Sequence, residues 1–468
     1  MAITITTANV QSLTTADAVT LTATQIGALT STLASQLSAS VIAVLKPVQL
    51  QALKTSALQV LSASQVAAFS TDDIPSFSST QIAAISSVGI TGLSASLASA
   101  LTDTQVKGIS TPVVAKLSAA QVGALSTKAV AVLSASQIAA LTSSAVSGLT
   151  EDQISALTTA QALTLYSSLS STAVAGLTAA QVAVIPTAVF GKLSATFVAS
   201  LSVSAVAGIT ADQAAVLTAT QTAALSTSAV AVLTAEQTSS FSAAATKKLS
   251  TSQVAALSDD GVAGLSVRLL DFRQINALST SGIKALTADQ MASLTGTQLR
   301  SVTTTVLATF SGDQISSLAI SALKVLSTSQ VASLTDTAVA GLTSAQFRAL
   351  PAASLRAITT TALAGLTADQ VAGLSATVVK NLASTQIASF NADQVSGLSV
   401  SAVRSLSATQ VASLTSEGIG GLSKTQLNAF SATQVASVAT GTIVGLSPEQ
   451  VGGLDSKITK ALTTTQVA

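Results

Sequence analysis

The sequence predicts an all-α solenoid built from very short helices, one for every eight residues. Three observations lead to this fold class. An eight-residue repeat runs through almost the whole chain, each repeat carries the residues that start a helix, and its apolar residues do not alternate as they would in a strand. Because a unit this short cannot bury its own apolar side chains, neighbouring units must stack and share one core.

The repeat reads Leu-[Ser/Thr]-x-x-[Gln/Ala]-[Val/Ile]-x-x, and we call it an octad, with Leu at position one. The octads that begin at Leu133, Leu141 and Leu149 follow one another without interruption. Fifty-six octads, the last one residue short, fill residues 13–164, 169–264 and 270–468, and the phase slips at 165–168 and 265–269. Residues 1–12 precede the first octad and are predicted to form an extended N-terminal arm.

Positions two and five carry the helix-start signal. Position two is Ser or Thr in 46 of the 56 octads, and position five is Gln in 28. A hydroxyl followed three residues later by Gln is a capping box, in which each side chain satisfies a backbone N–H group of the other residue. Leu at position one and Val or Ile at position six are then the two partners of a hydrophobic staple. Each octad therefore predicts one helix with its own start.

Charged residues and glycines indicate where each helix ends. Acidic residues favour the first turn of the predicted helices and basic residues the last turn, as the helix dipole favours. Gly closes several octads, which predicts a residue of left-handed backbone conformation at the helix C-terminus. These glycines include Gly148, Gly176, Gly208, Gly341 and Gly365.

Two other folds compete with the short-helix solenoid. A single continuous helix would rotate by about 80° per octad, so Leu and Val would not stay on one face. A β-solenoid stays open as an alternative, although positions one and six have opposite parity in a strand. After residue 270 a longer period of five octads appears, which suggests two superhelical turns of two and a half helices each.

Composition argues against an enzyme and against a nucleic-acid-binding protein. The chain has no His, Cys or Trp, so imidazole and thiolate chemistry is missing, and we expect no catalytic residue, cofactor or metal. The net charge is +1 and no Lys/Arg cluster occurs along the sequence, so we expect no nucleic-acid partner. The acidic doublets are interpreted as solvated helix N-termini: Asp72-Asp73, Glu151-Asp152 and Asp259-Asp260.

The sequence also bears on targeting. Mean hydropathy is +0.63, but Ser or Thr interrupts the apolar residues every few positions, so no run of about 20 apolar residues predicts a membrane span. The first residues, Met1 to Thr7, lack the basic and apolar regions of a cleaved signal peptide. Any export would therefore use an uncleaved signal.

The octads resemble the long Leu-Thr-x-x-Gln-Val-x-x-Leu arrays of bacterial secreted or cell-surface repeat proteins. The resemblance covers nearly all of the chain and rests on composition and repeat length. It implies a fibre, sheath or surface-layer material located outside the cell or on its surface. It transfers no catalytic residue, and it implies cell-surface components as possible partners.

These observations predict a structural protein that assembles head to tail with copies of itself into an extracellular filament or surface layer. The octad pattern continues in register to Ala468, so an apolar end surface is expected to be available for stacking. The expected interface residues are Ile3, Ile5, Leu462, Gln466 and Val467. The alternative function is a surface-binding repeat protein, either an adhesin or an ice-binding protein that uses regularly spaced Thr.

Overall fold

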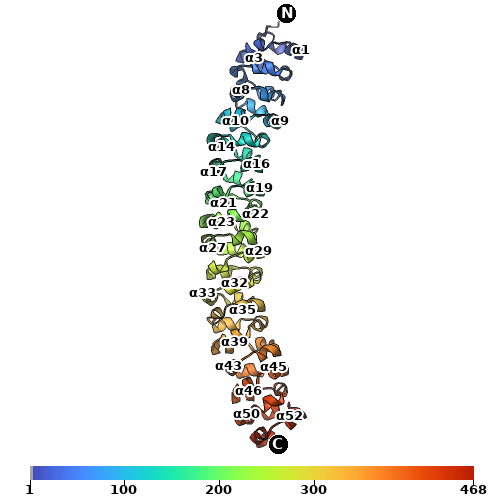
Figure 1. The fold of residues 1–468 in the computed structure, drawn as a ribbon, viewed down its shortest axis with the longest axis vertical. Coiled ribbons are helices and arrows are strands. Elements are labelled where there is room, and N and C mark those ends of the chain that lie inside the picture. The colour runs from blue at the N-terminus through green and yellow to red at the C-terminus, as the bar shows by residue number, and fades with distance from the viewer. Residues whose placement is uncertain (1–3) are drawn as a thin grey trace. The chain divides into compact units, whose positions relative to one another are not determined.

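A computed structural model describes residues 4–468 and confirms the all-α solenoid of short helices. The described chain contains 54 α-helices and four 3-10 helices, and it contains no strand. Each α-helix is four to six residues long, except one of ten residues. The chain divides into two compact units: unit 1 comprises Met1–Leu233 and Ser240–Lys248, and unit 2 comprises Thr234–Ser239 and Leu249–Ala468. Figure 1 shows the helices following one another within each unit.

The helices of unit 1 are η1 (Val10–Ser12), α1 (Thr15–Ala18), α2 (Ala23–Gly27), α3 (Ser31–Gln36), α4 (Ala39–Ile42), α5 (Pro47–Gln51), α6 (Thr55–Leu58), α7 (Ala63–Val66), η2 (Ile74–Ser76), α8 (Ser79–Ala84), η3 (Gly89–Gly92), α9 (Ala95–Ser99), α10 (Asp103–Gly108), α11 (Thr111–Val114), α12 (Ala119–Ala124), α13 (Thr127–Ala131), α14 (Ala135–Ala140), α15 (Ser143–Val146), α16 (Glu151–Ser155), α17 (Thr159–Ser168), α18 (Ser171–Ala175), α19 (Ala179–Ala183), α20 (Thr187–Phe190), α21 (Ala195–Ser200), α22 (Val203–Ala207), α23 (Ala211–Val216), α24 (Ala219–Ala224), α25 (Thr227–Val230) and α27 (Ala243–Lys248).

The helices of unit 2 are α26 (Ala235–Ser239), α28 (Thr251–Ala256), α29 (Asp259–Ala263), η4 (Val267–Leu269), α30 (Phe272–Ala277), α31 (Thr280–Lys284), α32 (Ala288–Ser293), α33 (Gly296–Arg300), α34 (Thr304–Leu307), α35 (Gly312–Ser317), α36 (Ile320–Leu323), α37 (Thr328–Ala332), α38 (Asp336–Ala340), α39 (Ser344–Ala349), α40 (Ala352–Ala357), α41 (Thr360–Ala364), α42 (Ala368–Ala372), α43 (Ala376–Asn381), α44 (Ser384–Ala388), α45 (Ala392–Gly397), α46 (Val400–Ser405), α47 (Ala408–Ala412), α48 (Ser416–Gly420), α49 (Lys424–Leu427), α50 (Ala432–Ser437), α51 (Thr440–Ile443), α52 (Pro448–Gly452), α53 (Ser456–Ala461) and α54 (Thr464–Val467).

The predicted capping boxes start these helices. Before α12, Ser118 is extended at φ −83° and ψ 166°, and its hydroxyl accepts the Gln121 N–H at 3.3 Å. The Gln121 side-chain oxygen in turn accepts the Ser118 N–H at 2.7 Å. Half of the box persists where position two has no hydroxyl, since Gln386 Oε1 accepts the Ala383 N–H at 2.7 Å. The caps satisfy backbone donors that so short a helix would otherwise leave unpaired.

The two staple positions form the core of each unit. Leu133 at position one is 4% exposed and Ile138 at position six is fully buried. Phenylalanines at position one are buried as core residues, as predicted, and these include Phe310, Phe390 and Phe430. Since most octads contribute one apolar side chain from position one and another from position six to the interior, the core continues from turn to turn inside each unit.

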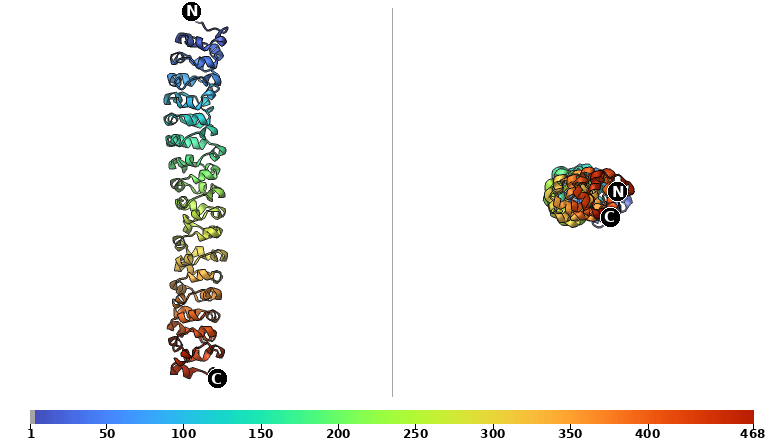
Figure 2. Two further views of the ribbon diagram at one scale, coloured as in Figure 1. Left: turned by 90° about the vertical axis from the view of Figure 1, so that its right-hand side faces the viewer. Right: turned by 90° about the horizontal axis from the view of Figure 1, so that it is seen from below.

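Three octads make one turn of the solenoid. In unit 1, helix α12 packs on α9 and α24 packs on α27; in unit 2, α42 packs on α45. The members of each pair begin three octads apart, and Figure 2 shows such helices stacked on one another within a unit. The expected two and a half helices per turn is therefore wrong. The longer period in the sequence is five octads, so it does not coincide with a turn, and similar octads recur on different sides of the solenoid.

The glycines that close octads have another role than the predicted one. No glycine in the described residues has a positive φ. Gly176 ends α18 in a right-handed conformation at φ −85° and ψ −6°, and other helices end at an extended Leu, as α14 does at Leu141. A Cβ added to Gly148 would overlap the carbonyl oxygen of Ala119, on a helix one turn earlier. Gly148 therefore allows two successive turns to approach closely. The prediction of left-handed glycine caps was wrong, because the backbone of the closing glycines stays right-handed, as it does at Gly176 and Gly208.

Substitutions at two glycines of unit 1 test whether a closing glycine is needed for the close approach of two turns. Gly148→Ala is expected to destabilise unit 1 by about 1–3 kcal/mol, because its methyl group would overlap backbone that cannot rotate away. Gly176→Ala is the matched control, since a Cβ there meets nothing closer than 3.4 Å. Chemical denaturation measures both. Equal destabilisation by the two substitutions would contradict the close-approach role of Gly148.

The two phase slips are absorbed in different ways. The four residues 165–168 lengthen α17 to ten residues, which adds about one helical turn. The five residues 265–269 contain η4, which packs on α32 as a full helix of the solenoid would. The first slip therefore lengthens a helix, and the second replaces an octad with a shorter unit. Each slip lies inside one unit, and the division between the units lies elsewhere.

Tyr166 fills the space that the lengthened α17 creates. Its side chain is 1% exposed and its ring lies edge-on to Phe197, with the ring centroids 5.9 Å apart. Burial raises the pKa of the Tyr166 hydroxyl above its usual value. The insertion is thus packed as core.

Residues 4–12 do not form the extended arm that we expected for residues 1–12, of which residues 1–3 lie outside the described residues. Residues 4–9 form a loop closed by Asn9, whose Nδ2 donates to the Thr4 carbonyl at 2.9 Å and whose Oδ1 accepts the Thr6 N–H at 2.8 Å. Helix η1 follows, and Val10 is buried at 1% exposure. Because Val10 packs as a core residue, this segment folds back onto the first helices.

Candidate assembly surfaces

The position-five glutamines connect successive turns. Gln121 is 4% exposed, and its Nε2 donates to the carbonyls of Ile90 at 2.8 Å and Leu93 at 2.7 Å, one turn earlier. Its Oε1 is already used in the capping box of α12. A side-chain amide has two N–H donors, so both donors of Gln121 are used between the turns while its oxygen caps the helix.

The same arrangement recurs throughout both units at a fixed spacing. The acceptors lie 28 and 31 residues before the glutamine, at position one and position six of earlier octads, as for Gln330 with Val302 at 2.7 Å and Leu299 at 2.8 Å. Some glutamines reach a carbonyl 30 residues earlier instead, as Gln450 does with Gly420 at 2.8 Å. Near the first phase slip Gln181 reaches Leu149, 32 residues before it, across the four inserted residues. Position five of one turn thus contacts positions one and six of the turn before.

Sequence reasoning identified the capping role of these glutamines and missed their link between turns. A signal was present. Glu completes a capping box as well as Gln does, yet none of the 56 octads has Glu at position five. Glu lacks the N–H donors that the two carbonyls of the preceding turn require. The absence of Glu therefore indicates that the far end of the side chain donates hydrogen bonds.

At the C-terminal side of unit 2, positions one and six are uncovered. Val451 is 50% exposed and Val467 is 70% exposed, whereas Val411 at position six of an inner octad is fully buried. Leu446 and Leu454, at position one, are only partly buried. We call the surface formed by residues 443–467 the C-terminal face. It presents the groups that an inner turn would cover with its position-five residues.

Of the predicted interface residues, Leu462 directly follows α53 and Gln466 lies in α54. Leu462 is partly buried and lines a cavity of about 30 Å³ together with Phe430 and Ile458. Gln466 Nε2 donates to the carbonyls of Val435 at 2.9 Å and Val438 at 2.7 Å. Gln466 thus binds its own preceding turn, and among the three predicted C-terminal residues the exposed apolar side chain is Val467.

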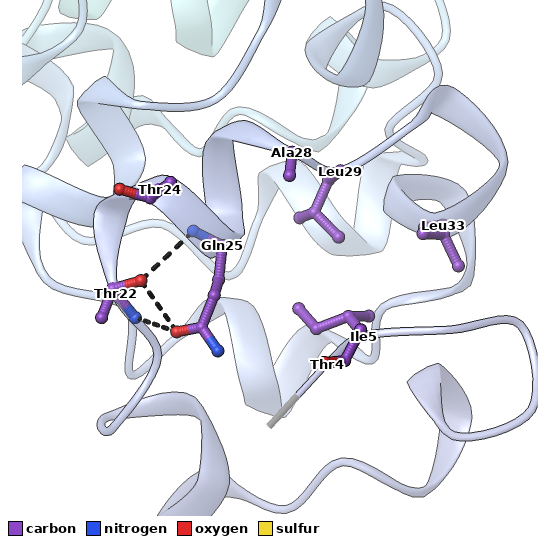
Figure 3. A pocket seen from close by; sticks show the side chains of 8 residues that line it. All are labelled: Thr4, Ile5, Thr22, Thr24, Gln25, Ala28, Leu29 and Leu33. Atoms are coloured by element: carbon purple, nitrogen blue, oxygen red, sulfur yellow. Dashed lines mark hydrogen bonds between the residues drawn. The ribbon is translucent and has the colours of Figure 1, made fainter. Parts of the chain in front are cut away.

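At the N-terminal side of unit 1, position-five side chains are partly uncovered. A cleft of about 330 Å³ is lined there by Ile5, Gln25, Leu33 and neighbouring residues, as Figure 3 shows. Ile5 is partly buried against this site, and Ile3 lies outside the described residues. We call the surface around this cleft the N-terminal face.

Capping also holds the first helices of unit 1 in place. Thr22 accepts the Gln25 N–H at 3.3 Å, and Asp17 takes the place of Gln before α1, accepting the Thr14 N–H at 2.9 Å. The hydrogen bonds from the Thr14 side chain and then its backbone lower the pKa of the Asp17 carboxyl. The side chains that frame the N-terminal face are therefore anchored in local structure.

The acidic doublets lie at helix starts, as predicted. Asp259 and Asp260 are in the first turn of α29, and Asp260 accepts the Ala235 N–H at 3.0 Å. Asp73 is 5% exposed and accepts the Ser70 N–H at 2.8 Å, so this member of its doublet is not solvated. In residues 4–468 no three His, Cys, Asp or Glu side chains are grouped as they would be around a metal ion.

The described helices are also too short or too polar to cross a lipid bilayer, and none of them is a candidate span.

Comparison with protein families gives one match. The sequence model of the ALTTAQ repeat matches residues 42–79 and residues 339–376. The hexapeptide Ala-Leu-Thr-Thr-Ala-Gln itself occurs at residues 156–161, where it comprises the position-one Leu157, the capping Thr158 and the position-five Gln161. No curated protein matches the chain by sequence. The chain is therefore a tandem repeat protein of short capped helices, and two of its segments match the ALTTAQ repeat.

Proposed function

We propose that the chain is a structural protein whose copies stack end to end into filaments. The observation that carries this proposal is the complementarity of the two faces. Between successive turns, position five of the later turn contacts positions one and six of the earlier turn. The N-terminal face presents position-five residues, and the C-terminal face presents positions one and six. A second copy can therefore repeat the contact that every inner turn already makes.

Apolar burial gives this contact its favourable free energy. Val451 and Val467 are exposed position-six side chains of the C-terminal face, and the partly buried Ile5 and Leu33 line the cleft of the N-terminal face. Covering each apolar side chain contributes on the order of 1–3 kcal/mol. The two faces differ, so the contact is heterologous, and repeated addition produces an open filament rather than a closed pair.

The alternative of an adhesive or ice-binding Thr surface receives less support. Such a surface needs free, regularly spaced hydroxyls, whereas position-two hydroxyls accept the N–H of position five, as Thr102 does from Gln105 at 3.3 Å. The resemblance to secreted and cell-surface repeat proteins supports a filament located outside the cell or on its surface. Antibody labelling of intact cells tests that location, and labelling that requires permeabilised cells would refute it.

The end-to-end contact is tested with charges on the C-terminal face. The variant Val451→Asp/Val467→Asp is expected to reduce particle mass in light scattering to that of single chains, because aspartate on this face would be buried without a partner. The matched control, Val88→Asp/Val203→Asp, places the same charges at valines that are 64% and 41% exposed on other octads. Circular dichroism should show equal helix content in both. Filaments of equal mass from both variants would refute the proposal.

A further inference from the structure

Twelve charged side chains of unit 2 fall into four rows that the sequence does not make apparent. Each row has three members, and neighbours within a row stand three octads apart, to within one position, which is one turn of the solenoid. We name them acidic row 1 (Asp289, Asp313, Asp336), basic row 1 (Arg300, Lys324, Arg348), basic row 2 (Arg356, Lys380, Arg404) and acidic row 2 (Asp369, Asp393, Glu417).

The helix packing places the members of a row on successive turns. In acidic row 1, helix α32 packs on α35 and α35 packs on α38; in basic row 1, α33 packs on α36 and α36 on α39. The same holds in the second pair of rows, where α40, α43 and α46 pack in order, as do α42, α45 and α48. Packed helices lie about 8–10 Å apart, so each row is a line of like charges at that spacing.

All twelve side chains are exposed. None of them forms an ion pair within the described residues, and the polar contacts of the basic side chains are limited to Arg356, whose Nε donates to the Asn381 carbonyl at 3.2 Å. The charges are thus free to meet a partner from outside the chain.

The helix dipole does not account for the rows. It explains why acidic residues stand in the first turn of an octad and basic residues near its end. It does not explain why the basic residues recur every third octad, since the C-terminus of any octad would serve equally well. Aligned like charges repel one another along the row, and opposite charges at the same spacing would relieve that repulsion.

The two rows of a pair occupy the same turns. Helix α33, with Arg300, directly follows α32, with Asp289, and the pattern repeats one turn later with α36 after α35. Ten octads separate Asp289 from Asp369, which is three turns and one further helix. The second pair of rows is therefore displaced by one column of helices, so that acidic row 2 continues the column that carries basic row 1.

We propose that a second copy of this chain binds along the side of unit 2, with acidic row 1 of each copy against basic row 1 of the other. Three charges face three charges at the same spacing, because both rows are built on the same turn. A two-fold arrangement satisfies both rows at once, since each copy contributes its acidic row 1 and its basic row 1 to the contact. This lateral contact is separate from end-to-end stacking and would associate filaments sideways.

Exposed ion pairs contribute little each and are screened by salt. The lateral contact is therefore weak and salt-dependent, and its charge pattern fixes the register of the two copies more than it raises their affinity. It is measured by sedimentation velocity of the full chain in the Val451→Asp/Val467→Asp background, so that end-to-end stacking does not contribute. We expect association at about 0.02 M salt and single chains at about 0.5 M salt.

Charge reversal tests the pairing. Arg300→Glu/Lys324→Glu/Arg348→Glu is expected to weaken association at least about tenfold, since acidic row 1 would then face glutamates. Adding Asp289→Lys/Asp313→Lys/Asp336→Lys to the same chain should restore it, because opposite rows meet again. The control variant Lys107→Glu/Lys116→Glu/Lys192→Glu carries the same charge change on exposed lysines of unit 1 and should associate as the parent does.

Three results would overturn the lateral contact. The first is that the Val451→Asp/Val467→Asp chain remains a single chain at low salt. The second is that the variant with three glutamates in basic row 1 associates as strongly as that chain. The third is that the variant with both rows reversed retains its helix content but does not regain association. Binding of heparin to basic row 1 without self-association would likewise assign the row to a polyanion instead of a second copy.

Discussion

Replacing Gln153 by Glu is expected to destabilise unit 1 by about 3–5 kcal/mol. Gln153 is 1% exposed, and its Nε2 donates to the carbonyls of Val122 at 3.0 Å and Leu125 at 2.6 Å. Glutamate keeps the oxygen that caps α16, but it places a second carboxylate oxygen against two carbonyl oxygens in a buried site. The substitution thus preserves the capping role and removes only the link between turns.

The pH dependence of the unfolding free energy of Gln153→Glu is an independent test of the same link. Burial and the nearby carbonyls raise the folded-state pKa of the introduced carboxyl above its unfolded value of about 4.3. The variant's deficit in unfolding free energy is therefore expected to be largest at neutral pH. It should shrink as the pH falls through the raised pKa, because the neutral acid donates one hydrogen bond.

Gln59→Glu is the matched control, since Gln59 is exposed and lies at the end of α6. Surface substitutions of this kind change stability by less than about 0.5 kcal/mol. Urea denaturation and hydrogen exchange of residues 117–157 measure both variants. If Gln153→Glu lowered the unfolding free energy no more than Gln59→Glu does, the glutamine link between turns would not contribute to stability.

Removing both staple side chains of one octad is the second large effect. Leu249 is 3% exposed and Val254 is 1% exposed, so Leu249→Ala/Val254→Ala leaves a cavity in the core of unit 2. Large-to-small substitutions of a buried Leu alone cost about 2–5 kcal/mol, and the double variant is expected to exceed that range. Hydrogen exchange should locate the loss at α28 and the helices packed on it.

The surface charges Lys284 and Asp289 provide the comparison for the staple. Both are exposed on α31 and α32, and replacing either by Ala is expected to change the unfolding free energy by less than about 1 kcal/mol. Equal losses from the staple variant and from these charge variants would contradict a core built from positions one and six.

Local structure was the part of the fold that the sequence predicted well. Capping residues act within four positions along the chain, so Ser118 and Gln121 indicate the start of α12 without any knowledge of its neighbours. The burial of Leu at position one and Val or Ile at position six follows from the same spacing, as Leu133 and Ile138 illustrate. These features depend only on residues close together in the chain, so they can be predicted without knowing how the turns are arranged.

The arrangement of the turns was not predictable in the same way. Three octads per turn depends on contacts between side chains that stand three to four octads apart, and the most visible long period in the sequence is five octads. Gly148 was assigned to a helix end because its contact, the backbone at Ala119, lies more than three octads earlier in the chain. The charge rows are hidden for the same reason, since three octads separate Arg300 from Lys324.

The candidate surfaces were predicted in part. Val467 is exposed, as an interface residue should be, whereas Gln466 is bound within its own chain and Ile5 folds back onto the first helices. The missing element was the polarity of the contact between turns. That polarity arises because the position-five glutamines of one turn reach positions one and six of the turn before.

Electron microscopy of the wild-type chain over a range of concentrations tests the central claim most directly. The stacking of faces predicts particles of uniform width at high salt, where lateral contacts are screened, with lengths that increase as the concentration rises. In the Val451→Asp/Val467→Asp variant the long particles should disappear. Wild-type particles that keep the length of a single chain at every concentration would contradict end-to-end assembly.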